Sequence, residues 1–406
     1  MTATDVKPPV GVGVRLHGLD ALRAGALGLG IVLHSLMPFA PGMGWLLTDA
    51  RTSAAVGVPL FVIHLFRMTV FMLLAGFFGR MVVHRRGAGA YLRDRTVRIL
   101  APMVAFWPVA VMPLGLLVAA NASLRGATPP QPPSRPGAPE ALAMFSPGQL
   151  WFLLVLFEVS ALTLGVRWVA LRAARWASGA ASDGEGAAGM SGPGRDLTCL
   201  TRAVGRALSG PAGVLAAAVP YYLCVLAQGD ATGGIAAPTT ILPEVAPLVA
   251  YLGAFGVGWA LHADPDALAR IARQWPGQLA AAIALSAAGY VTAPATLSVP
   301  GHAALVALAG WTWTYALLGL CVRFLRRERP VIRYLADSSY WAYLVHLPLL
   351  VGFELLIADQ PWPIAAKLLL TWTVVGAALL GSYQVLVRKT WLGQWLNGHR
   401  YGRARR

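Results

Sequence analysis

The chain has 406 residues, of which 57% are hydrophobic and only 12% are charged, and its net charge is +16 at pH 7. A water-soluble domain usually carries about 25% charged residues, so this composition excludes an ordinary soluble enzyme and indicates a membrane protein. The positive charges stand between apolar segments, which argues against a nucleic-acid-binding protein and fits loops that face anionic lipid. The three cysteines, Cys199, Cys224 and Cys321, show neither metal-ligand spacing nor a disulfide framework.

Ten apolar segments are long enough to cross a bilayer, which takes about 20 helical residues. The sequence therefore predicts an all-α polytopic integral membrane protein, a bundle of about ten transmembrane helices. We expect a transmembrane domain over residues 19–387, preceded by a segment 1–18 and followed by a basic tail 388–406. The expected spans are 19–40, 57–83, 99–120, 149–170, 211–228, 241–261, 277–293, 302–322, 338–358 and 364–387. A Pro-rich loop (121–148) and a flexible Gly/Ala/Ser-rich linker (177–198) interrupt them.

Lys and Arg residues gather on alternate connections between these segments. The connections on one side, with both chain ends, hold 25 of the 33, whereas the opposite loops hold only Arg51, Arg125 and Arg135. Positive loops stay in the cytoplasm, so this pattern predicts a plasma-membrane protein with both termini cytoplasmic. An even number of spans requires the same arrangement.

The first apolar segment carries three polar residues at helical spacing, Asp20, Arg23 and His34. Eleven residues at 100° each return almost to the starting angle, so Arg23 and His34 share one helix face, about 16 Å apart along the axis. Asp20 lies three residues before Arg23 and can pair with it. A functional ion pair with a deeper imidazole is one interpretation, and a snorkelling arginine with a structural histidine is the other.

The second apolar segment places His64 at about the depth of His34, and Arg67 one turn further along. Arg67 is far from either end of the segment, so it needs a carboxylate, a polar cavity or an anionic ligand. We expect Glu158, near the middle of the fourth segment, to be its partner. The pair could be structural or catalytic, and His64 alone is compatible with a structural role.

Two further groups of residues are candidates for a functional role. Arg93, Arg95 and Arg98 form a positive cluster in the loop YLRDRTVRILAPM, which suits phosphate groups but is equally explained as a charge run that sets the topology. His346 lies inside the ninth segment, where a buried structural histidine is the alternative to a functional one. No metal site is visible in the sequence.

Several motifs together resemble the membrane-bound acyltransferase 3 family. They are the LDALRA opening with Arg23-x10-His34, FRMTVFMLLAGFF, the RxxR of Arg95 and Arg98, LWFLLVLF, and SSYWAYLVHLP. The second segment is similar to the glucan biosynthesis protein C type of branch. One departure is Ala75-Gly76, where the family often has Ser before Gly.

The resemblance implies an enzyme that moves an acyl group, of acetyl or succinyl type, from cytoplasmic acyl-CoA to a hydroxyl of a carbohydrate or related acceptor of the cell envelope. It implies that His34 is the catalytic histidine, that Arg23 positions the donor, and that Arg95 and Arg98 contact it. Neutral His34 would then be a base or carry the acyl group itself, and Arg67 or Arg23 would stabilise negative charge.

Acyl-CoA would be a donor substrate, with no metal cofactor and no nucleic-acid partner, and the oligomeric state, monomer or homo-oligomer, is left open. Two other functions are also compatible with intramembrane Arg, His and Glu. One is a proton-coupled transporter or flippase of an envelope precursor or small metabolite, which would favour paired broken helices. The other is a membrane protein that binds the acceptor without catalysis.

Overall fold

The computed structural model describes residues 16–124, 146–181, 193–229, 233–238, 240–292 and 297–398, and for 177–181 and 193–196 only the backbone. This part of the chain is all-helical, as the sequence predicts. The long helices are α1 (His17–Leu36), α2 (Gly57–Arg86), α3 (Ala88–Arg95), α4 (Ala101–Ala110), α5 (Met112–Leu124), α7 (Trp151–Ala181), α8 (Pro193–Leu208), α9 (Gly213–Gln228), α10 (Val245–Ala263), α11 (Ala267–Val291), α12 (Val299–Phe324), α13 (Pro330–Ile357) and α14 (Ile364–Ser382). Short elements are η1 (Met37–Phe39), η2 (Ala54–Val56), the π-helical turns η3 (Thr96–Leu100) and η5 (Tyr383–Val387), η4 (Gly148–Leu150) and α15 (Trp391–Asn397).

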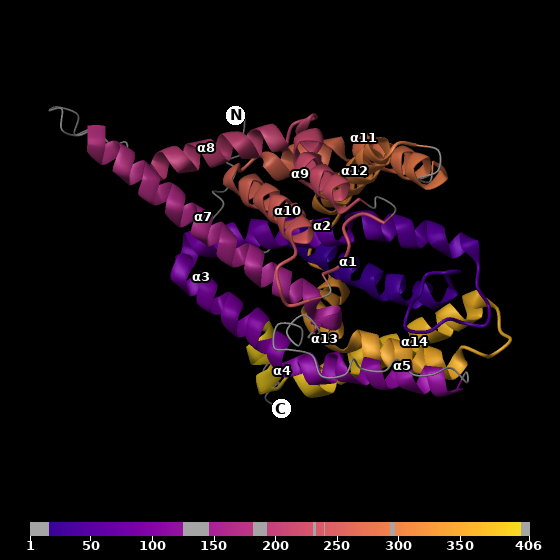
Figure 1. The fold of residues 1–406 in the computed structure, drawn as a ribbon. Helices are drawn as coiled ribbons and strands as arrows, with labels where there is room; N and C mark the ends of the chain where they lie inside the picture. Colours follow the sequence, from indigo (N-terminus) through magenta and orange to yellow (C-terminus); the bar gives the residue numbers. More distant parts are fainter. Residues whose placement is uncertain are drawn as a thin grey trace, which may run out of the picture.

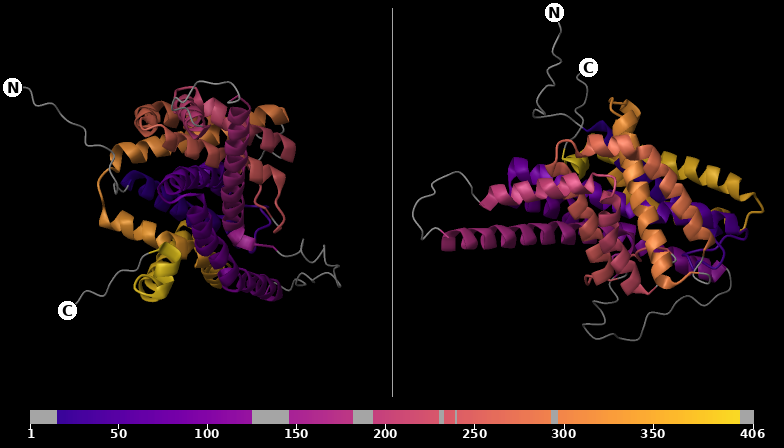
Figure 2. Two further views of the ribbon diagram at one scale, coloured as in Figure 1. Left: turned by 90° about the vertical axis from the view of Figure 1, so that its left-hand side faces the viewer. Right: turned by 90° about the horizontal axis from the view of Figure 1, so that it is seen from above.

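The helices form three layers. Helices α1 and α2 lie in the middle, with α8 to α12 on one side of them and α5, α13 and α14 on the other (Figure 1). The end of α7 projects from the bundle and α8 returns toward it (Figure 2). Both α1 and α2 are therefore enclosed by other helices, which is where polar side chains in a membrane protein can find partners.

In the described residues, eight helices are long and apolar enough to span a bilayer, or nine if the bent pair Leu197–Leu208 and Gly213–Gln228 counts as one span. The sequence predicted ten. The span that is missing is the one predicted at 277–293, which corresponds to α11. The first half of α11 is too polar for a typical membrane span, because it holds Arg270, Arg273, Gln274 and Gln278.

Even so, α11 runs the full length of the bundle. It begins beside Asp264, which pairs with Arg270, and ends where Tyr290 donates a hydrogen bond to the Ala54 carbonyl, 3.5 Å away. Its 25 residues cover about 37 Å at 1.5 Å each, more than the roughly 30 Å of a hydrocarbon core. The polar residues of α11 thus lie in its first half, and the helix is long enough to cross a bilayer although it is not among the eight or nine candidate spans of the described residues.

The two ends of the bundle differ in charge. The end that holds the start of α1, the end of α2 and the α12–α13 connection is called the "basic end". The end that holds the loop 40–53 is called the "opposite end". The start of α1 meets Arg327, Arg329 and Arg333 around one pocket, and α15 hydrogen-bonds to the backbone of η3. Both ends of the described chain therefore lie at the basic end.

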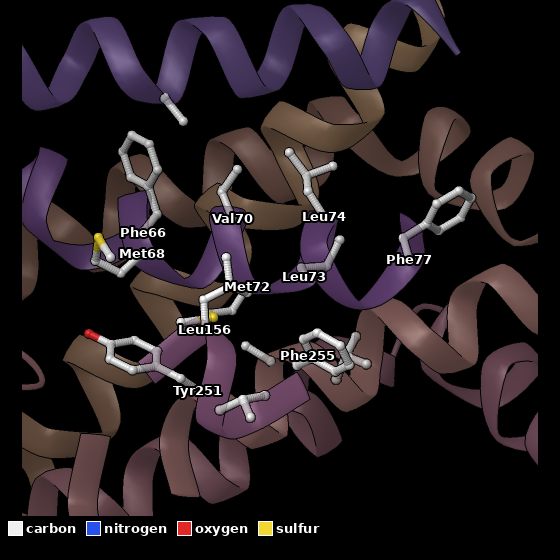
Figure 3. Close-up of a cluster of buried hydrophobic side chains, with 14 of the residues drawn as sticks. Phe66, Met68, Val70, Met72, Leu73, Leu74, Phe77, Leu156, Tyr251 and Phe255 are labelled. Carbon is white, nitrogen blue, oxygen red and sulfur yellow. The ribbon is translucent and has the colours of Figure 1, made fainter. Parts of the chain in front are cut away.

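The core is built around α2, whose apolar side chains face α1 on one side and α7 and α10 on the other (Figure 3). Glycines allow α2 and α10 to approach each other closely. A Cβ at Gly76 would lie 1.9 Å from the Phe255 carbonyl oxygen, and one at Gly258 would lie 1.8 Å from the Leu73 carbonyl oxygen. Small residues at such crossings are how transmembrane helices gain packing energy without a hydrophobic driving force. This close contact fixes the direction in which α2 presents its polar residues.

Some predicted boundaries are corrected. Helices α7 and α8 extend into the linker predicted at 177–198, and its residues 182–192 lie outside the described residues. The same holds for 125–145 of the Pro-rich loop. The basic tail contains helix α15, which packs on the bundle because Trp395 Nε1 donates to the Val97 carbonyl at 2.8 Å.

Candidate functional site

The ring of His34 lies at the centre of a group of polar and aromatic side chains. It stacks on Trp45 from the loop 40–53, with ring centroids 5.6 Å apart and planes at 15°. On α13, the His346 ring lies 5.4 Å away. The His34 Nδ1 atom is buried and has no hydrogen-bond partner within the described residues. A nitrogen without a partner is available to a ligand.

Arg67 of α2 reaches the same place from the neighbouring helix. Its guanidinium lies against Gly30, one turn before His34, where a Cβ would come within 2.6 Å of Nη1. Arg67, His346 and His64 all lie within electrostatic range of the His34 ring. The absence of a side chain at Gly30 therefore lets a guanidinium approach the backbone of α1 beside the histidine.

The segment 233–238 between α9 and α10 holds His64. The His64 ring is hydrogen-bonded to the backbone of Ile235, and the Ile235 N–H donates to Tyr221 Oη at 3.2 Å. Gln228 fixes the same segment, since its Nε2 donates to the Gly234 carbonyl at 3.0 Å. One nitrogen of His64 is thus occupied by the backbone, which fits a supporting role.

A similar bond orients His346. Its Nδ1 lies 2.8 Å from the Tyr343 carbonyl, so a neutral ring donates there and leaves Nε2 as the basic nitrogen. Tyr343 in turn donates from Oη to the Gln149 carbonyl at 2.5 Å, and Gln149 Nε2 donates to the Leu344 carbonyl at 3.0 Å. The residue just before the LWFLLVLF motif is therefore hydrogen-bonded twice to the SSYWAYLVHLP motif.

No carboxylate neutralises Arg67 in the described part of the chain. Its Nε is buried without a hydrogen-bond partner, and its electrostatic neighbours are the tyrosines Tyr251 and Tyr343. The predicted pairing with Glu158 is wrong, since no ion pair of the described residues joins the two side chains. The physical reason is that Arg67 points toward Gly30 of α1, while Glu158 belongs to α7 on the other side of α2. We call His34, His64, Arg67 and His346 the "His–Arg centre".

The predicted ion pair of α1 is present. Asp20 and Arg23 lie 3.5 Å apart, and Arg23 also donates to the Ala336 carbonyl of α13 at 3.4 Å. Asp20 borders a shallow pocket at the basic end, which opens to solvent and is lined by His17, Asp20, Arg327, Glu328, Arg329, Ile332 and Arg333. Arg23 is therefore separated from His34 by three turns of α1 and does not touch the His–Arg centre.

The charges of Arg95 and Arg98 are partly neutralised by one acid, Asp94, which pairs with both. Asp94 lies 3.5 Å from Arg95 and 3.2 Å from Arg98, and Arg95 also lies over the Tyr91 ring at 4.9 Å. The guanidinium of Arg98 packs against Gly398, after α15. Arg93 is exposed beside them. One net positive charge remains on the RxxR pair.

Sequence reasoning missed a buried ion pair at the opposite end. The Lys367 side chain is 0% exposed, and its Nζ donates to both carboxylate oxygens of Asp49, at 2.8 and 2.7 Å, and to the Ala358 carbonyl at 2.9 Å. Asp49 also accepts from the Arg51 N–H at 2.8 Å. The sequence does point to Lys367 as a residue that needs a partner, because it is the sole charged residue of the span predicted at 364–387. This pair fixes the loop that carries Trp45.

Glu354 is another residue that the sequence analysis passed over. It is 3% exposed, and neither of its carboxylate oxygens has a hydrogen-bond partner within the described residues. It follows His346 on α13 by eight residues, about 12 Å toward the opposite end. Trp45 Nε1 is also buried and unpartnered. Both groups are suited to a ligand with hydroxyls.

A metal-binding arrangement is not found in the described part of the chain, where no three His, Cys, Asp or Glu side chains are placed to hold one ion.

Comparison with known proteins identifies one family. Residues 16–383 match the profile of a family described as an acyltransferase domain. No curated protein and no solved structure matches the chain.

Proposed function

The chain belongs to the acyltransferase 3 family, a family of membrane acyltransferases, and on this premise we propose that it moves an acyl group from acyl-CoA to a hydroxyl of a carbohydrate or related acceptor. The observation that carries this proposal is the His–Arg centre, where the unpartnered Nδ1 of His34 and the unneutralised guanidinium of Arg67 lie together between helices. A base beside a fixed positive charge is what acyl transfer needs.

In the proposed reaction the acceptor hydroxyl oxygen attacks the thioester carbonyl carbon while His34 takes the hydroxyl proton. Arg67 stabilises the oxyanion that forms, and the C–S bond then breaks. The CoA thiolate leaves and receives the proton from His34. A second route, in which His34 attacks first and carries the acyl group before passing it to the hydroxyl, uses the same atoms. His346, with Nδ1 held by the Tyr343 carbonyl, has its other nitrogen free for a relayed proton.

We place the donor at the basic end, which in this proposal faces the cytoplasm of the cell. Arg95 and Arg98 with Arg93, and Arg23 on α1, would meet the CoA phosphates there, since guanidinium groups match phosphate oxygens. Arg23 and His34 are separated by about 16 Å along α1, a span that an extended pantetheine arm can cover. The location of the RxxR pair beside Tyr340 of α13, whose Oη donates to the Arg98 carbonyl at 2.7 Å, supports this path.

We place the acceptor at the opposite end, outside the cytoplasm. Trp45 offers an apolar face and an N–H, and Glu354 offers two acceptor oxygens, a combination that suits a polyhydroxylated ring. The acyl group in this proposal is short, acetyl or succinyl, as the family resemblance implies. A glucan of the cell envelope is the acceptor proposed from the resemblance of the second span.

The transporter alternative expects broken helices in corresponding halves of the bundle. One bent pair, Leu197–Leu208 with Gly213–Gln228 at 97°, is found in the described residues. It is a single pair without a counterpart elsewhere in the described residues, so it does not supply the two broken helices that a transporter would favour.

The experiment is to incubate the purified protein with acetyl-CoA or succinyl-CoA and to follow release of the CoA thiol. In parallel, mass spectrometry compares envelope glycans of cells with and without the protein. Thiol release that depends on His34, together with a lost acyl mass on one glycan, supports the proposal. Transport of a solute without thiol release would contradict it.

A further inference from the structure

A second group of cations lies at the basic end, apart from the RxxR pair. Arg80 and His84 come from α2, Arg167 from α7, Arg202 from α8 and His262 from α10. Arg80 lies within electrostatic range of Arg167 and Arg202. The rings of His84 and His262 are 6.5 Å apart, and Arg202 Nε donates to the Ala263 carbonyl at 3.5 Å. We call these five residues the "Arg80 cluster".

The Arg80 cluster is buried at its bottom and open to solvent at its rim. Arg80 is 3% exposed and its Nε has no hydrogen-bond partner, whereas His84 and Arg202 are exposed. Four helices thus bring positive or protonatable side chains around one enclosed guanidinium. A ligand that approaches from the basic end meets the rim first and Arg80 last.

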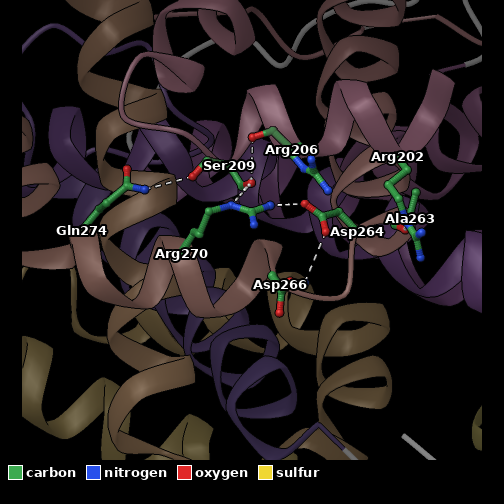
Figure 4. A network of polar contacts seen from close by, with 8 residues as sticks. All are labelled: Arg202, Arg206, Ser209, Ala263, Asp264, Asp266, Arg270 and Gln274. Atoms are coloured by element: carbon green, nitrogen blue, oxygen red, sulfur yellow. Dashed lines mark hydrogen bonds and ion pairs between the residues drawn. The ribbon is translucent and has the colours of Figure 1, made fainter. Parts of the chain in front are cut away.

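No carboxylate of the described residues is ion-paired to any member of this cluster. The acid closest in sequence to His262 is Asp264, and its carboxylate is taken by Arg270, which also donates to Ser209 Oγ at 2.9 Å (Figure 4). Arg202 lies next to Ala263 without reaching that pair (Figure 4). Within the described residues, the cluster is therefore left without a negative charge, unlike Arg95 and Arg98.

Like charges repel more strongly where protein replaces water. The C-terminal ends of α2 and α10 attract cations through their carbonyl groups, which accounts for the two histidines and for one arginine. It does not account for three guanidinium groups around one buried position. An anion with several oxygens would satisfy them all.

We propose that the Arg80 cluster binds a phosphate group, because planar guanidinium forks match phosphate oxygens in pairs. The phosphate could belong to CoA, in which case the site is a second anchor for the donor and rests on the proposed function. It could equally belong to the headgroup of an anionic lipid, since the cluster faces the basic end of a membrane protein. The chemistry of recognition is the same, and experiment separates the two sources.

The test uses the purified full-length protein in phosphatidylcholine nanodiscs. Calorimetry measures the dissociation constant of CoA for the wild type, Arg80→Gln and the rim variant Arg202→Gln. The control is Arg172→Gln, which removes an equal charge from α7, where Arg172 lies over the Trp168 ring outside the cluster. Native mass spectrometry then counts phosphatidylglycerol retained by each variant from mixed nanodiscs, and melting temperatures confirm folding.

If CoA is the source, Arg80→Gln and Arg202→Gln weaken CoA binding roughly tenfold, as expected for a lost charged hydrogen bond, and the control does not. If a lipid is the source, CoA binding is unchanged and less phosphatidylglycerol is retained. Equal behaviour of Arg80→Gln and Arg172→Gln in both measurements overturns the inference. His34→Ala should bind both probes normally, so a failure of acyl transfer alone would count against the proposed function and not against this site.

Discussion

Two cations inside this bundle, Lys367 and Arg67, have opposite surroundings. Lys367 is surrounded by three oxygen acceptors, two from Asp49 and one from Ala358, and its charge is neutralised. Arg67 has no carboxylate within the described residues, and its neighbours are imidazoles and phenols. A buried charge is costly unless paired, so the first arrangement is complete in itself and the second is completed by a ligand. Removing each cation should therefore have different consequences.

The largest effect is expected from Lys367→Met. It leaves the Asp49 carboxylate buried without its counter-ion, which should lower the free energy of unfolding by about 3–5 kcal/mol, as for other broken buried pairs. Thermal unfolding in detergent measures this change. Lys367→Met with Asp49→Leu should recover much of the loss. A single variant as stable as the wild type would contradict a structural role for the pair.

Arg67→Gln should have the opposite consequence to Lys367→Met, a loss of activity without a loss of stability. It removes a charge that has no carboxylate partner among the described residues, so stability should hold, while kcat for acyl transfer should fall roughly 10²- to 10³-fold through loss of oxyanion stabilisation. Arg172→Gln serves as the control for net charge. If kcat stays near the wild-type value, Arg67 has no part in the reaction and the comparison with Lys367 fails.

A smaller effect is expected at Gly30, which gives the Arg67 guanidinium its place. In Gly30→Ala the new Cβ would meet Nη1 at 2.6 Å and displace it, whereas Gly28→Ala meets nothing within 4 Å. A displacement of about 1 Å at a reacting group can reduce a rate up to roughly 100-fold, and we expect a fall near tenfold for Gly30→Ala. Parallel assays of both variants test this, and equal rates would show that Arg67 is not positioned by α1.

The smallest effect concerns the RxxR pair, which Asp94 already half neutralises. Arg95→Ala with Arg98→Ala should raise KM for acyl-CoA about tenfold and leave KM for the acceptor unchanged. High salt should reproduce part of this change in the wild type. An unchanged KM for the donor, with altered membrane orientation, would mean that these arginines only set the topology.

Much of this arrangement was predictable from periodicity. The Asp20–Arg23 pair and the common depth of His34 and His64 follow from the rise and turn of a helix. The partner of Arg67 could not be predicted, because depth along a span says nothing about which neighbour a side chain faces. That direction is set by the close α2–α10 crossing at Gly76 and Gly258.

Contacts between distant parts of the chain were likewise beyond the sequence. Trp45 stacks on His34 because its loop is tied down by Asp49 and Lys367, which are 318 residues apart. Helix α11 shows the limit of composition. The sequence predicted a span at 277–293 and the helix is long enough for one, but its first half is too polar for it to count among the eight or nine candidate spans of the described residues.

The measurement that tests the central claim most directly is acyl transfer by His34→Ala, beside the wild type, in purified and folded protein. We predict that thiol release from acyl-CoA falls by roughly 10²- to 10⁴-fold, the range for loss of a general base, while the melting temperature and CoA binding stay within error of the wild type. A folded His34→Ala protein that transfers acyl groups at the wild-type rate would contradict the account.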